Sequence, residues 1–387
     1  MKERNKTFYT VLITFVLTLA LVAAAVFIFF LKYDIPFYKL FKVASIIEAS
    51  YIEEYDRDKC EENAINAVLE TIGDKYAVYY DEENAEKTMQ LIEGYYIGIG
   101  IEIFANTERG YIEVISAYED SPADKAGIIG GDFIKAIDGK EYTASSMADA
   151  VSYMKGLDVK NPLETPISMT IIRGEEEFTV TLNREEINMY KVSCETVDDI
   201  CYIRYSGYTS ASLEEFKKII NNLGKEIKGI VVDVRNNPGG EFSSAINMCD
   251  LFLEDETILY TVDKNGEKTV YSAKKGSCKL PLAIIVNGST ASAAEIFAGS
   301  MQANNRAVIV GEKTYGKGVS QTVRYLNPLN KSDGALKLTT CKNYTPDGKW
   351  INEAITPDVL AEVAPLDGNI TQDAAFITAV KSLKEDK

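Results

Sequence analysis

Apolar runs that alternate with helical patterns are the feature that most restricts the fold of this 387-residue chain. Residues 228–234 read KGIVVDV, a continuous apolar run, and helical patterns flank it at 212–223 and 243–253. The sequence predicts further strands at 201–205 and 307–310. Continuous apolar strands separated by helices are typical of a mostly parallel sheet with helices packed on it. The part of the chain after residue 190 is therefore predicted to form an α/β domain.

Residues 287–321 bring serines, small residues and a glycine-bracketed lysine into this region. Ser292 stands where a strand turns into a helix, so the helix N-terminal amides and the positive end of its dipole lie beside the hydroxyl. Lys317 follows a further strand, between Gly316 and Gly318. A serine and a lysine held on one core are a candidate nucleophile and base. The alternative is a small-residue helix start followed by a surface lysine in a glycine turn.

The chain contains no histidine. A Ser-His-Asp triad is therefore excluded, and so is any metal site that needs imidazole. A serine hydrolase built on this chain would use lysine as its base. Lysine has an ordinary pKa of about 10.4, and making it neutral near physiological pH costs about 4 kcal/mol of desolvation or like-charge repulsion.

The predicted strand at 228–234 runs into residues 235–240, which read RNNPGG. Glycines at the carboxyl end of such a strand expose backbone amides at the edge where open α/β sheets bind ligands. Such amides can form an oxyanion hole. A tight turn without a function is the alternative.

Residues 8–31 carry no charge and are long enough to cross the hydrocarbon core of a bilayer. Three basic residues precede them, Lys2, Arg4 and Lys6, which favours a cytoplasmic N-terminus. We expect an uncleaved single-pass anchor in the cell membrane with the rest of the chain extracytoplasmic; a cleaved signal peptide is the alternative. The net charge of −17 argues against nucleic acid as a partner.

Between residues 43 and 92 the apolar spacing is helical, with a break at Gly73-Asp74. From residue 94 to 186 the period changes to that of strands, separated by glycine-rich turns. The runs YIGIGIEI and SPADKAGIIGGDFIKAIDGKEY resemble a PDZ domain of the kind associated with bacterial proteases. We expect the loop Ile97, Gly98, Ile99 and Gly100 to receive a peptide carboxylate, beside an edge strand that accepts the peptide by β-augmentation.

Four motifs after residue 230 extend the resemblance: DVRNNPGG, NGSTASAAEIFAG, GEKTYGKGVSQ and ALKLTTCKNYTPDGKWIN. Together and in this order they resemble the C-terminal processing peptidases, also called tail-specific proteases. The resemblance covers nearly everything after the anchor. It implies a serine endopeptidase with a crotonase/ClpP-like α/β core and an inserted PDZ domain, which engages the carboxyl end of a protein substrate and cleaves through an acyl-enzyme.

The resemblance also assigns roles within the site. It places the nucleophile on Ser292, with Ser289 as the less favoured choice, and the general base on Lys317. It places a lysine-holding glutamine on Gln321 and the oxyanion amides on Gly240 and Ala293. Some members carry an acidic residue eleven positions after the nucleophile, where this chain has Ala303, so that contribution is in doubt. Glu295 is given no catalytic role, and neither a metal nor an organic cofactor is expected.

The predicted fold class is an α+β multidomain chain. Its expected parts are a cytoplasmic tail (1–7), a transmembrane anchor (8–31), a helical N-terminal module (32–93), a PDZ domain (94–186), the serine-lysine peptidase domain (187–365) and a C-terminal helical tail (366–387).

Two other functions compete with the peptidase: a PDZ scaffold with a silent catalytic region, and a crotonase-type acyl-CoA enzyme. The expected partners are the C-termini of proteins or peptides, the membrane, a second copy of the chain in a homodimer and an activating protein. Cys194 and Cys201 flank a predicted turn and could face each other across a hairpin, or stay as free thiols like the other four cysteines.

Overall fold

The computed structural model describes residues 14–18, 37–118, 120–157, 159, 161–274, 276, 278–329, 333–363 and 369–385. The chain divides into two compact units, Met1–Ala64 and Ile65–Lys387. A search of the described residues finds no helix with the length and apolar character needed to span a membrane. The predicted anchor, residues 8–31, lies outside the described residues except for 14–18.

The first unit contains α2 (Tyr38–Ser50) and the beginning of α3 (Arg57–Ile72). None of the residues of α2 is buried. Its large apolar side chains, including Phe41, Val43 and Ile46, are exposed instead. The helical prediction for this part of the chain is confirmed.

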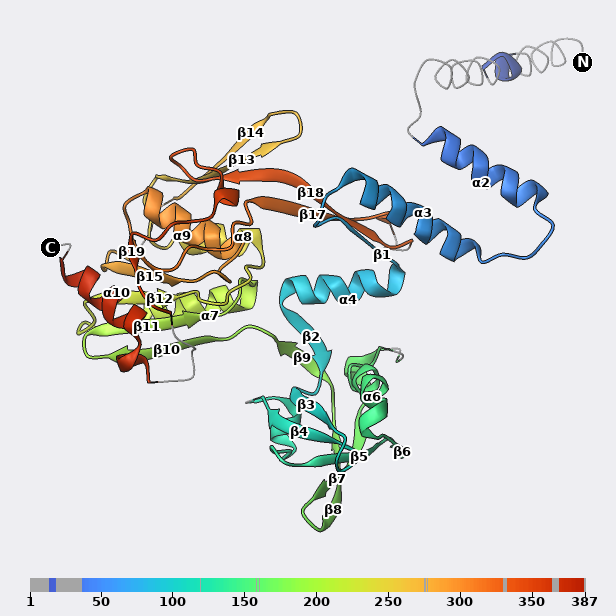
Figure 1. The fold of residues 1–387 in the computed structure, drawn as a ribbon, viewed down its shortest axis with the longest axis horizontal. Helices are drawn as coiled ribbons and strands as arrows, with labels where there is room; N and C mark the ends of the chain where they lie inside the picture. The colour runs from blue at the N-terminus through green and yellow to red at the C-terminus, as the bar shows by residue number, and fades with distance from the viewer. Residues whose placement is uncertain are drawn as a thin grey trace, which may run out of the picture. The chain divides into compact units, whose positions relative to one another are not determined.

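The second unit contains the predicted α/β domain, built on a six-stranded sheet in the order β10-β11-β12-β15-β16-β19 (Figure 1). Within this sheet β11, β12, β15, β16 and β19 run parallel, and β10 pairs antiparallel with β11. Every residue of β12 and β15 is buried, which confirms the prediction made for β12 from the apolar run at 228–234. The strands are β10 (Val192–Val197), β11 (Ile200–Tyr205), β12 (Gly229–Asp233), β15 (Leu282–Val286), β16 (Val308–Gly311) and β19 (Val359–Leu360).

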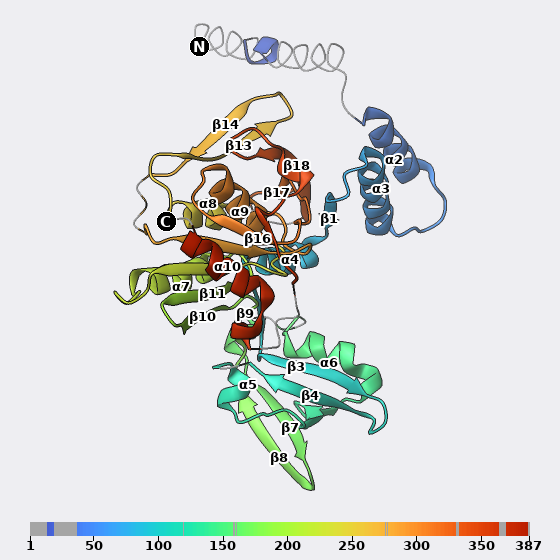
Figure 2. The same cartoon turned by 60° about the vertical axis from the view of Figure 1, so that its left-hand side comes forward.

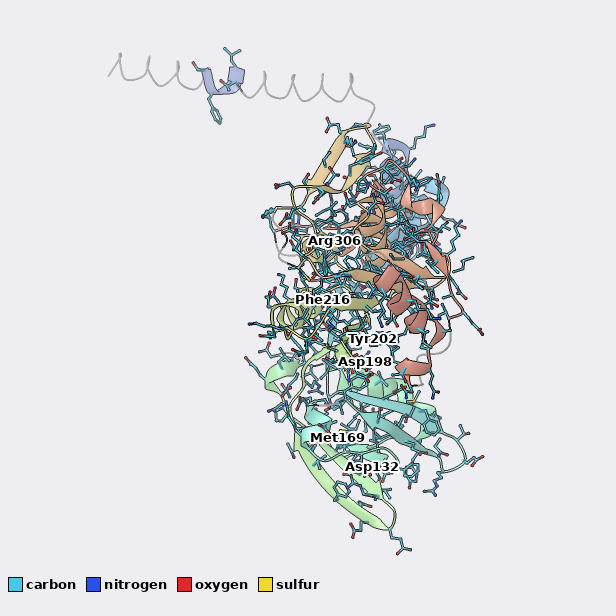
Figure 3. The ribbon with its side chains drawn as sticks, turned by 90° about the vertical axis from the view of Figure 1, so that its left-hand side faces the viewer. Asp132, Met169, Asp198, Tyr202, Phe216 and Arg306 are labelled. Atoms are coloured by element: carbon cyan, nitrogen blue, oxygen red, sulfur yellow. The ribbon has the colours of Figure 1, made fainter. Side chains whose placement is uncertain are left out.

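Helices cover both faces of this sheet. On one face, α7 (Ser210–Asn221), α8 (Phe242–Cys249) and α9 (Ala293–Ala303) form a core whose buried aromatic residues include Phe216 (Figure 3). On the other face, α10 (Ala374–Glu385) lies against β12, β15 and β16 (Figure 2). Its residues Ala375, Phe376, Ala379 and Leu383 are buried there. The predicted C-terminal tail thus contains a helix that closes the second face of the peptidase sheet.

A second sheet has the order β1-β18-β13-β14, with β17 also paired to β18. Its strands are β13 (Thr257–Asp263), β14 (Lys268–Ser272), β17 (Val319–Tyr325), β18 (Ala335–Tyr344) and β1 (Val78–Tyr80). Strand β1 is an addition to the sequence prediction, because it lies between the predicted break at Gly73-Asp74 and α4 (Glu82–Glu93), in a region predicted to be helical apart from that break. A strand of three residues is too short to produce a period, and it exists through antiparallel pairing with residues 335–337.

The predicted PDZ region contains a sheet in the order β3-β4-β5-β7-β8, with β6 paired to β5. A two-stranded ribbon of β2 (Tyr95–Gly98) and β9 (Glu185–Asn188) precedes and follows it in the chain. The other elements of the predicted PDZ region are β3 (Ile101–Asn106), β4 (Tyr111–Ala117), α5 (Pro122–Lys125), β5 (Phe133–Ile137), β6 (Lys140–Glu141), α6 (Met147–Met154), β7 (Ile167–Arg173) and β8 (Glu176–Leu182). The buried residues Asp132 and Met169, marked in Figure 3, belong to this region.

Cys194 and Cys201 lie on the paired strands β10 and β11, and their Sγ atoms are 3.1 Å apart. The Cys201 thiol is buried, which raises its pKa, whereas Cys194 is exposed. The structure thus brings together the two thiols for which the sequence suggested a hairpin contact.

We predict that glutathione disulfide converts this pair into a disulfide, because the thiols are already in contact. The two thiols give up two electrons and two protons, and glutathione disulfide is reduced. Closing so short a loop should stabilise the fold by about 2.5 kcal/mol. Non-reducing peptide mass spectrometry checks the linkage, with the buried and unpaired Cys249 as the control that stays a thiol. A Cys194 that remains open to alkylation after treatment would contradict the prediction.

Candidate active site

The loop after β12 is fixed by an asparagine that sequence reasoning did not single out. The buried Asn237 donates from Nδ2 to the Tyr205 carbonyl at 2.7 Å and accepts the Gly239 amide on Oδ1 at 2.8 Å. Its own carbonyl accepts the amide of Ala291 at 2.9 Å. The loop that carries Gly240 is therefore tied to the loop that carries Ser292.

Ser292 is the residue immediately before α9, as the sequence predicts. Its backbone has φ 56° and ψ −115°, a conformation that residues with a side chain rarely adopt and that costs on the order of 1–3 kcal/mol. Sharp strand-to-helix turns of this kind hold nucleophilic serines at the surface of α/β sheets. Ser289, the alternative nucleophile, is exposed in the preceding turn, where its amide donates to the side chain of Asn287.

The carboxylate of Glu295 joins the serine turn to the lysine turn. It is fully buried and accepts four hydrogen bonds, two on each oxygen. The amides of Ser292 and Lys317 donate to Oε2 at 2.9 and 2.8 Å, while the Thr314 hydroxyl and the Gly316 amide donate to Oε1 at 2.6 and 2.7 Å. This residue, to which the sequence gave no role, therefore fixes the backbone on both sides of the predicted dyad.

Lys317 is half-buried, and burial is the main reason why its pKa lies below the ordinary lysine value. The positive charges of Lys337 and Lys75 lower the pKa further, while the negative charge of Glu295 raises it. This is the direction that a lysine base requires. Across the described residues, no hydrogen bond links the Lys317 ammonium to the Ser292 hydroxyl.

Gln321 lies on β17, directly after an irregularity in the pairing with β18. Its Nε2 donates to the Val319 carbonyl at 3.4 Å, so the side chain is turned toward its own strand rather than bonded to Lys317. Ala303, at the end of α9, contributes no charged group. The structure thus brings Ser292 and Lys317 together through Glu295 and leaves Gln321 outside that network.

The two predicted oxyanion donors are available. Of the backbone amides that the structure describes around the site, those of Gly240 and Ala293 donate to no acceptor. Gly240 is exposed at φ 138°, and its neighbour Gly239 lies so close to the serine turn that an added Cβ would come within 2.8 Å of the Ala293 nitrogen. Two unpaired amides beside a strained serine are what an oxyanion hole requires.

A groove of about 60 Å³ runs between β3 and α6 in the predicted PDZ region. Within it Gly98 ends β2, and Ile99 and Gly100, the latter with φ 73°, form the turn that leads to β3. Ile97 belongs to β2 and does not line the groove. Strand β3 is the edge of its sheet, as predicted for a peptide-accepting strand. The apolar wall of the groove consists of Ile101, Ile103, Val151 and Met154.

A buried ion pair stabilises the loop after β12, which carries Gly240. The Arg235 guanidinium is fully buried and donates to Asp233 at 2.9 Å and to Asp373 at 2.8 Å. Burial disfavours its charge, but the bonds to Asp233 and then to Asp373 raise the pKa of Arg235 above its ordinary value. Tyr202, labelled in Figure 3, donates to the same Asp233 at 2.7 Å. Asp373 comes from the segment before α10, far along the chain.

We predict that Asp373→Ala lowers the free energy of unfolding by about 3 kcal/mol. The substitution removes a charge-assisted hydrogen bond to a buried guanidinium and the side-chain acceptor for the Phe376 amide at the start of α10. Asp373→Asn keeps an acceptor for that amide but loses the charge, so it should lower the free energy of unfolding by less than Asp373→Ala does. Urea unfolding measures both variants, and equal stability of Asp373→Ala and the wild type would rule the ion pair out as a support.

Comparison with known proteins identifies the arrangement. The chain matches peptidase family S41 over residues 199–361 and a PDZ domain over residues 113–163. It is 36% identical over 327 residues to a carboxy-terminal-processing protease of Bartonella bacilliformis, covering 82% of this chain and 73% of that protein. The chain belongs to the C-terminal processing peptidases of family S41. It is therefore a serine-type peptidase, and neither the silent scaffold nor the acyl-CoA enzyme describes it.

Other relatives support the same membership. This peptidase is 32% identical over 382 residues to the carboxy-terminal processing protease CtpA of Bacillus subtilis, covering 94% of this chain and 78% of that protein. Its fold is similar to that of a photosystem II D1 C-terminal processing protease, with a TM-score of 0.51, 24% identity and coverage of 88% and 90% of the two chains. The crotonase/ClpP-like core with a PDZ domain and N-terminal helices is thereby established.

In the described part of the peptidase, no group of three or more Cys, Asp or Glu residues is arranged to hold a metal ion.

Proposed function

We propose that this C-terminal processing peptidase cleaves its substrates with Ser292 as the nucleophile and Lys317 as the general base. The carrying observation is the Glu295 carboxylate, which binds the amides of both residues. In the proposed reaction neutral Lys317 takes the proton from the Ser292 hydroxyl, whose oxygen attacks the scissile carbonyl. The protonated lysine then supplies the proton to the leaving amine.

The amides of Gly240 and Ala293 hold the negative charge that develops on the carbonyl oxygen. Both amides lack another acceptor among the described residues, which supports this role. Water then attacks the acyl-enzyme, and Lys317 again takes a proton from it. When the ester bond breaks, Lys317 returns this proton to the Ser292 oxygen and the carboxylic acid product leaves. Gln321 is proposed to orient Lys317 once the side chains rearrange from their present hydrogen bonding.

We further propose that the PDZ region selects the substrate by its C-terminus. The turn Gly98, Ile99 and Gly100 would receive the carboxylate, with Ile97 holding that turn on β2, and β3 would pair with the peptide. The apolar groove wall favours an apolar side chain at the terminal positions of the peptide. An activating partner that binds this region would then control Lys317 and Ser292.

We also propose an extracytoplasmic location in the cell membrane, with residues 8–31 as the anchor and the soluble parts on the outer side. The charge-free length of this stretch and the basic residues that precede it support the proposal. Protease accessibility of the chain in spheroplasts tests the topology, and complete protection of the PDZ and peptidase regions would contradict it.

A homodimer is proposed through the N-terminal helical part. The exposed apolar residues of α2 support it, since none of the residues of this helix is buried against the described part of the chain. Analytical ultracentrifugation of the full chain in detergent measures the assembly, and a monomer at all concentrations would remove the proposal.

The central test is cleavage of an unfolded protein or of a peptide with an apolar C-terminus by the full chain. Ser292→Ala and Lys317→Ala should each lower kcat by about 10⁴-fold or more. Ser289→Ala is the matched control, because it removes the neighbouring exposed serine and should retain activity. Cleavage that survives Ser292→Ala, or is lost in Ser289→Ala alone, would overturn the assignment of the nucleophile.

A further inference from the structure

A short segment before the PDZ region reaches the lysine of the peptidase site. Residues 74–80 lie outside both matched regions, 113–163 and 199–361. The ring of Tyr76 packs against Lys317, whose Nζ lies 4.9 Å from the ring centroid. The neighbouring Lys75 ammonium lies 4.8 Å from the same centroid.

Two anchors fix this segment on β18 of the second sheet. The Asp74 carboxylate accepts the backbone amide of Thr339 at 3.0 Å and its hydroxyl at 3.1 Å. After Tyr76, strand β1 pairs with β18 in the register Val78 opposite Lys337. Tyr76 lies between these two anchors in the chain, so the backbone that carries its ring is fixed on both sides.

The hydroxyl of Tyr76 is buried and forms no hydrogen bond with any described residue. Lys75 is close enough for the hydroxyl to raise the pKa of Lys75, but the geometry falls short of a hydrogen bond. A buried hydroxyl without a partner costs about 1–3 kcal/mol. The hydroxyl of Tyr76 therefore does not stabilise the fold. The part of this side chain that makes a favourable contact with its surroundings is the ring.

We propose that Tyr76 is a positioning residue for Lys317, whose ring shields the lysine amine from water and fixes it beside the serine turn. The inference rests on the proposed role of Lys317 as base. The ring occupies space beside the amine, which restricts the side chain, and its bulk excludes the water that would otherwise solvate the ammonium, so the neutral amine is favoured. The peptidase site is thus completed by a residue from outside the peptidase region.

The charges around Lys317 come from three elements. Lys337 on β18 and Lys75 beside Tyr76 repel the ammonium, and Glu295 on α9 attracts it. Burial is the largest cause of the lowered pKa of Lys317, and Tyr76 provides an apolar surface in direct contact with Nζ. Removing the ring should admit water and move the pKa back toward the ordinary lysine value.

Competitive acetylation tests this proposal without relying on cleavage. The full chain carrying Ser292→Ala is treated with limiting acetic anhydride over a pH series, and mass spectrometry measures the acetylation of Lys317 against that of exposed lysines. With Tyr76 present, Lys317 should reach half-acetylation at a lower pH than the exposed lysines. Tyr76→Ala should move that midpoint upward by about 1 pH unit, and Tyr76→Phe should restore it.

Tyr79→Ala is the matched control, because Tyr79 lies three residues further on, within β1, and directs its hydroxyl to the Asp333 carbonyl at 3.3 Å. An equal shift in Tyr79→Ala would show that loosening β1 is the cause and would overturn the role of Tyr76. An unchanged midpoint in Tyr76→Ala would overturn it as well.

Cleavage assays with Ser292 restored separate this inference from the proposed function. Tyr76→Ala should move the acidic limb of the kcat/KM profile upward, with about tenfold lower activity at neutral pH. If the acetylation midpoint shifts while Lys317→Ala retains full activity, Tyr76 positions Lys317 but Lys317 is not the base. If Lys317→Ala is inactive while Tyr76→Ala keeps the wild-type pH profile, the base is correct and the role of Tyr76 is wrong.

Discussion

Glu295→Gln is expected to lower kcat by at least about 100-fold although Glu295 takes no part in the proposed proton transfers. An ionised carboxylate accepts hydrogen bonds on both oxygens, and all four of its partners are donors. A glutamine amide nitrogen would place hydrogens against two of those donors. Either the turn of Ser292 or the turn of Lys317 must then move away.

The same substitution should destabilise the fold by about 4 kcal/mol, because it leaves buried backbone amides without acceptors. It should also change the pH profile of the residual activity. The negative charge of Glu295 raises the pKa of Lys317, so its removal lowers that pKa. The acidic limb of kcat/KM, which follows loss of the proton from Lys317, should therefore move to lower pH.

Kinetics over a pH series and urea unfolding measure these effects. Glu312→Gln is the matched control, since Glu312 is exposed on the turn after β16 and should tolerate the change. Wild-type kcat in Glu295→Gln would show that the shared carboxylate is not what aligns the dyad. If the acidic limb of kcat/KM moved to higher pH in Glu295→Gln, the negative charge of Glu295 would not be what raises the pKa of Lys317.

The position of Ser292 could be predicted because it depends on local sequence. A strand, a small-residue turn and an apolar helical pattern are read within about ten neighbouring residues, and the structure begins α9 directly after Ser292. The same holds for β12, whose continuous apolar run is a buried strand of a parallel sheet. Family resemblance then distinguished Ser292 from Ser289, which local pattern alone did not.

The role of Glu295 could not be read in this way, because its partners are separated along the chain and three of them are backbone amides. Every residue except proline has a backbone amide, so a sequence motif does not show which amides bind the carboxylate. Tyr76 was missed for a related reason: its place depends on the pairing of β1 with β18, more than 250 residues away. Long-range pairing of a very short strand leaves no period in the sequence.

Gly239→Ala is expected to lower kcat by about 10³-fold, because Gly239 lies between the serine turn and the proposed oxyanion amides. A Cβ at this position would come within 2.8 Å of both the Ala293 nitrogen and the Ser292 Cβ, and within 2.9 Å of the Ala291 carbonyl oxygen. Backbone atoms cannot give way at such distances without moving the loop. The two proposed donors, Gly240 and Ala293, would then no longer converge on one oxygen.

An alanine at Gly239 would be affected both by backbone strain at positive φ and by the clash of its Cβ with the serine turn. Gly266→Ala separates these two causes. Gly266, in the β13–β14 hairpin, also has positive φ, but an added Cβ meets nothing within 4 Å. Its replacement should cost about 1–2 kcal/mol of stability and leave kcat unchanged. If the two alanine variants lose the same stability and Gly239→Ala still cleaves at the wild-type rate, the close approach of the two loops does not form the oxyanion hole.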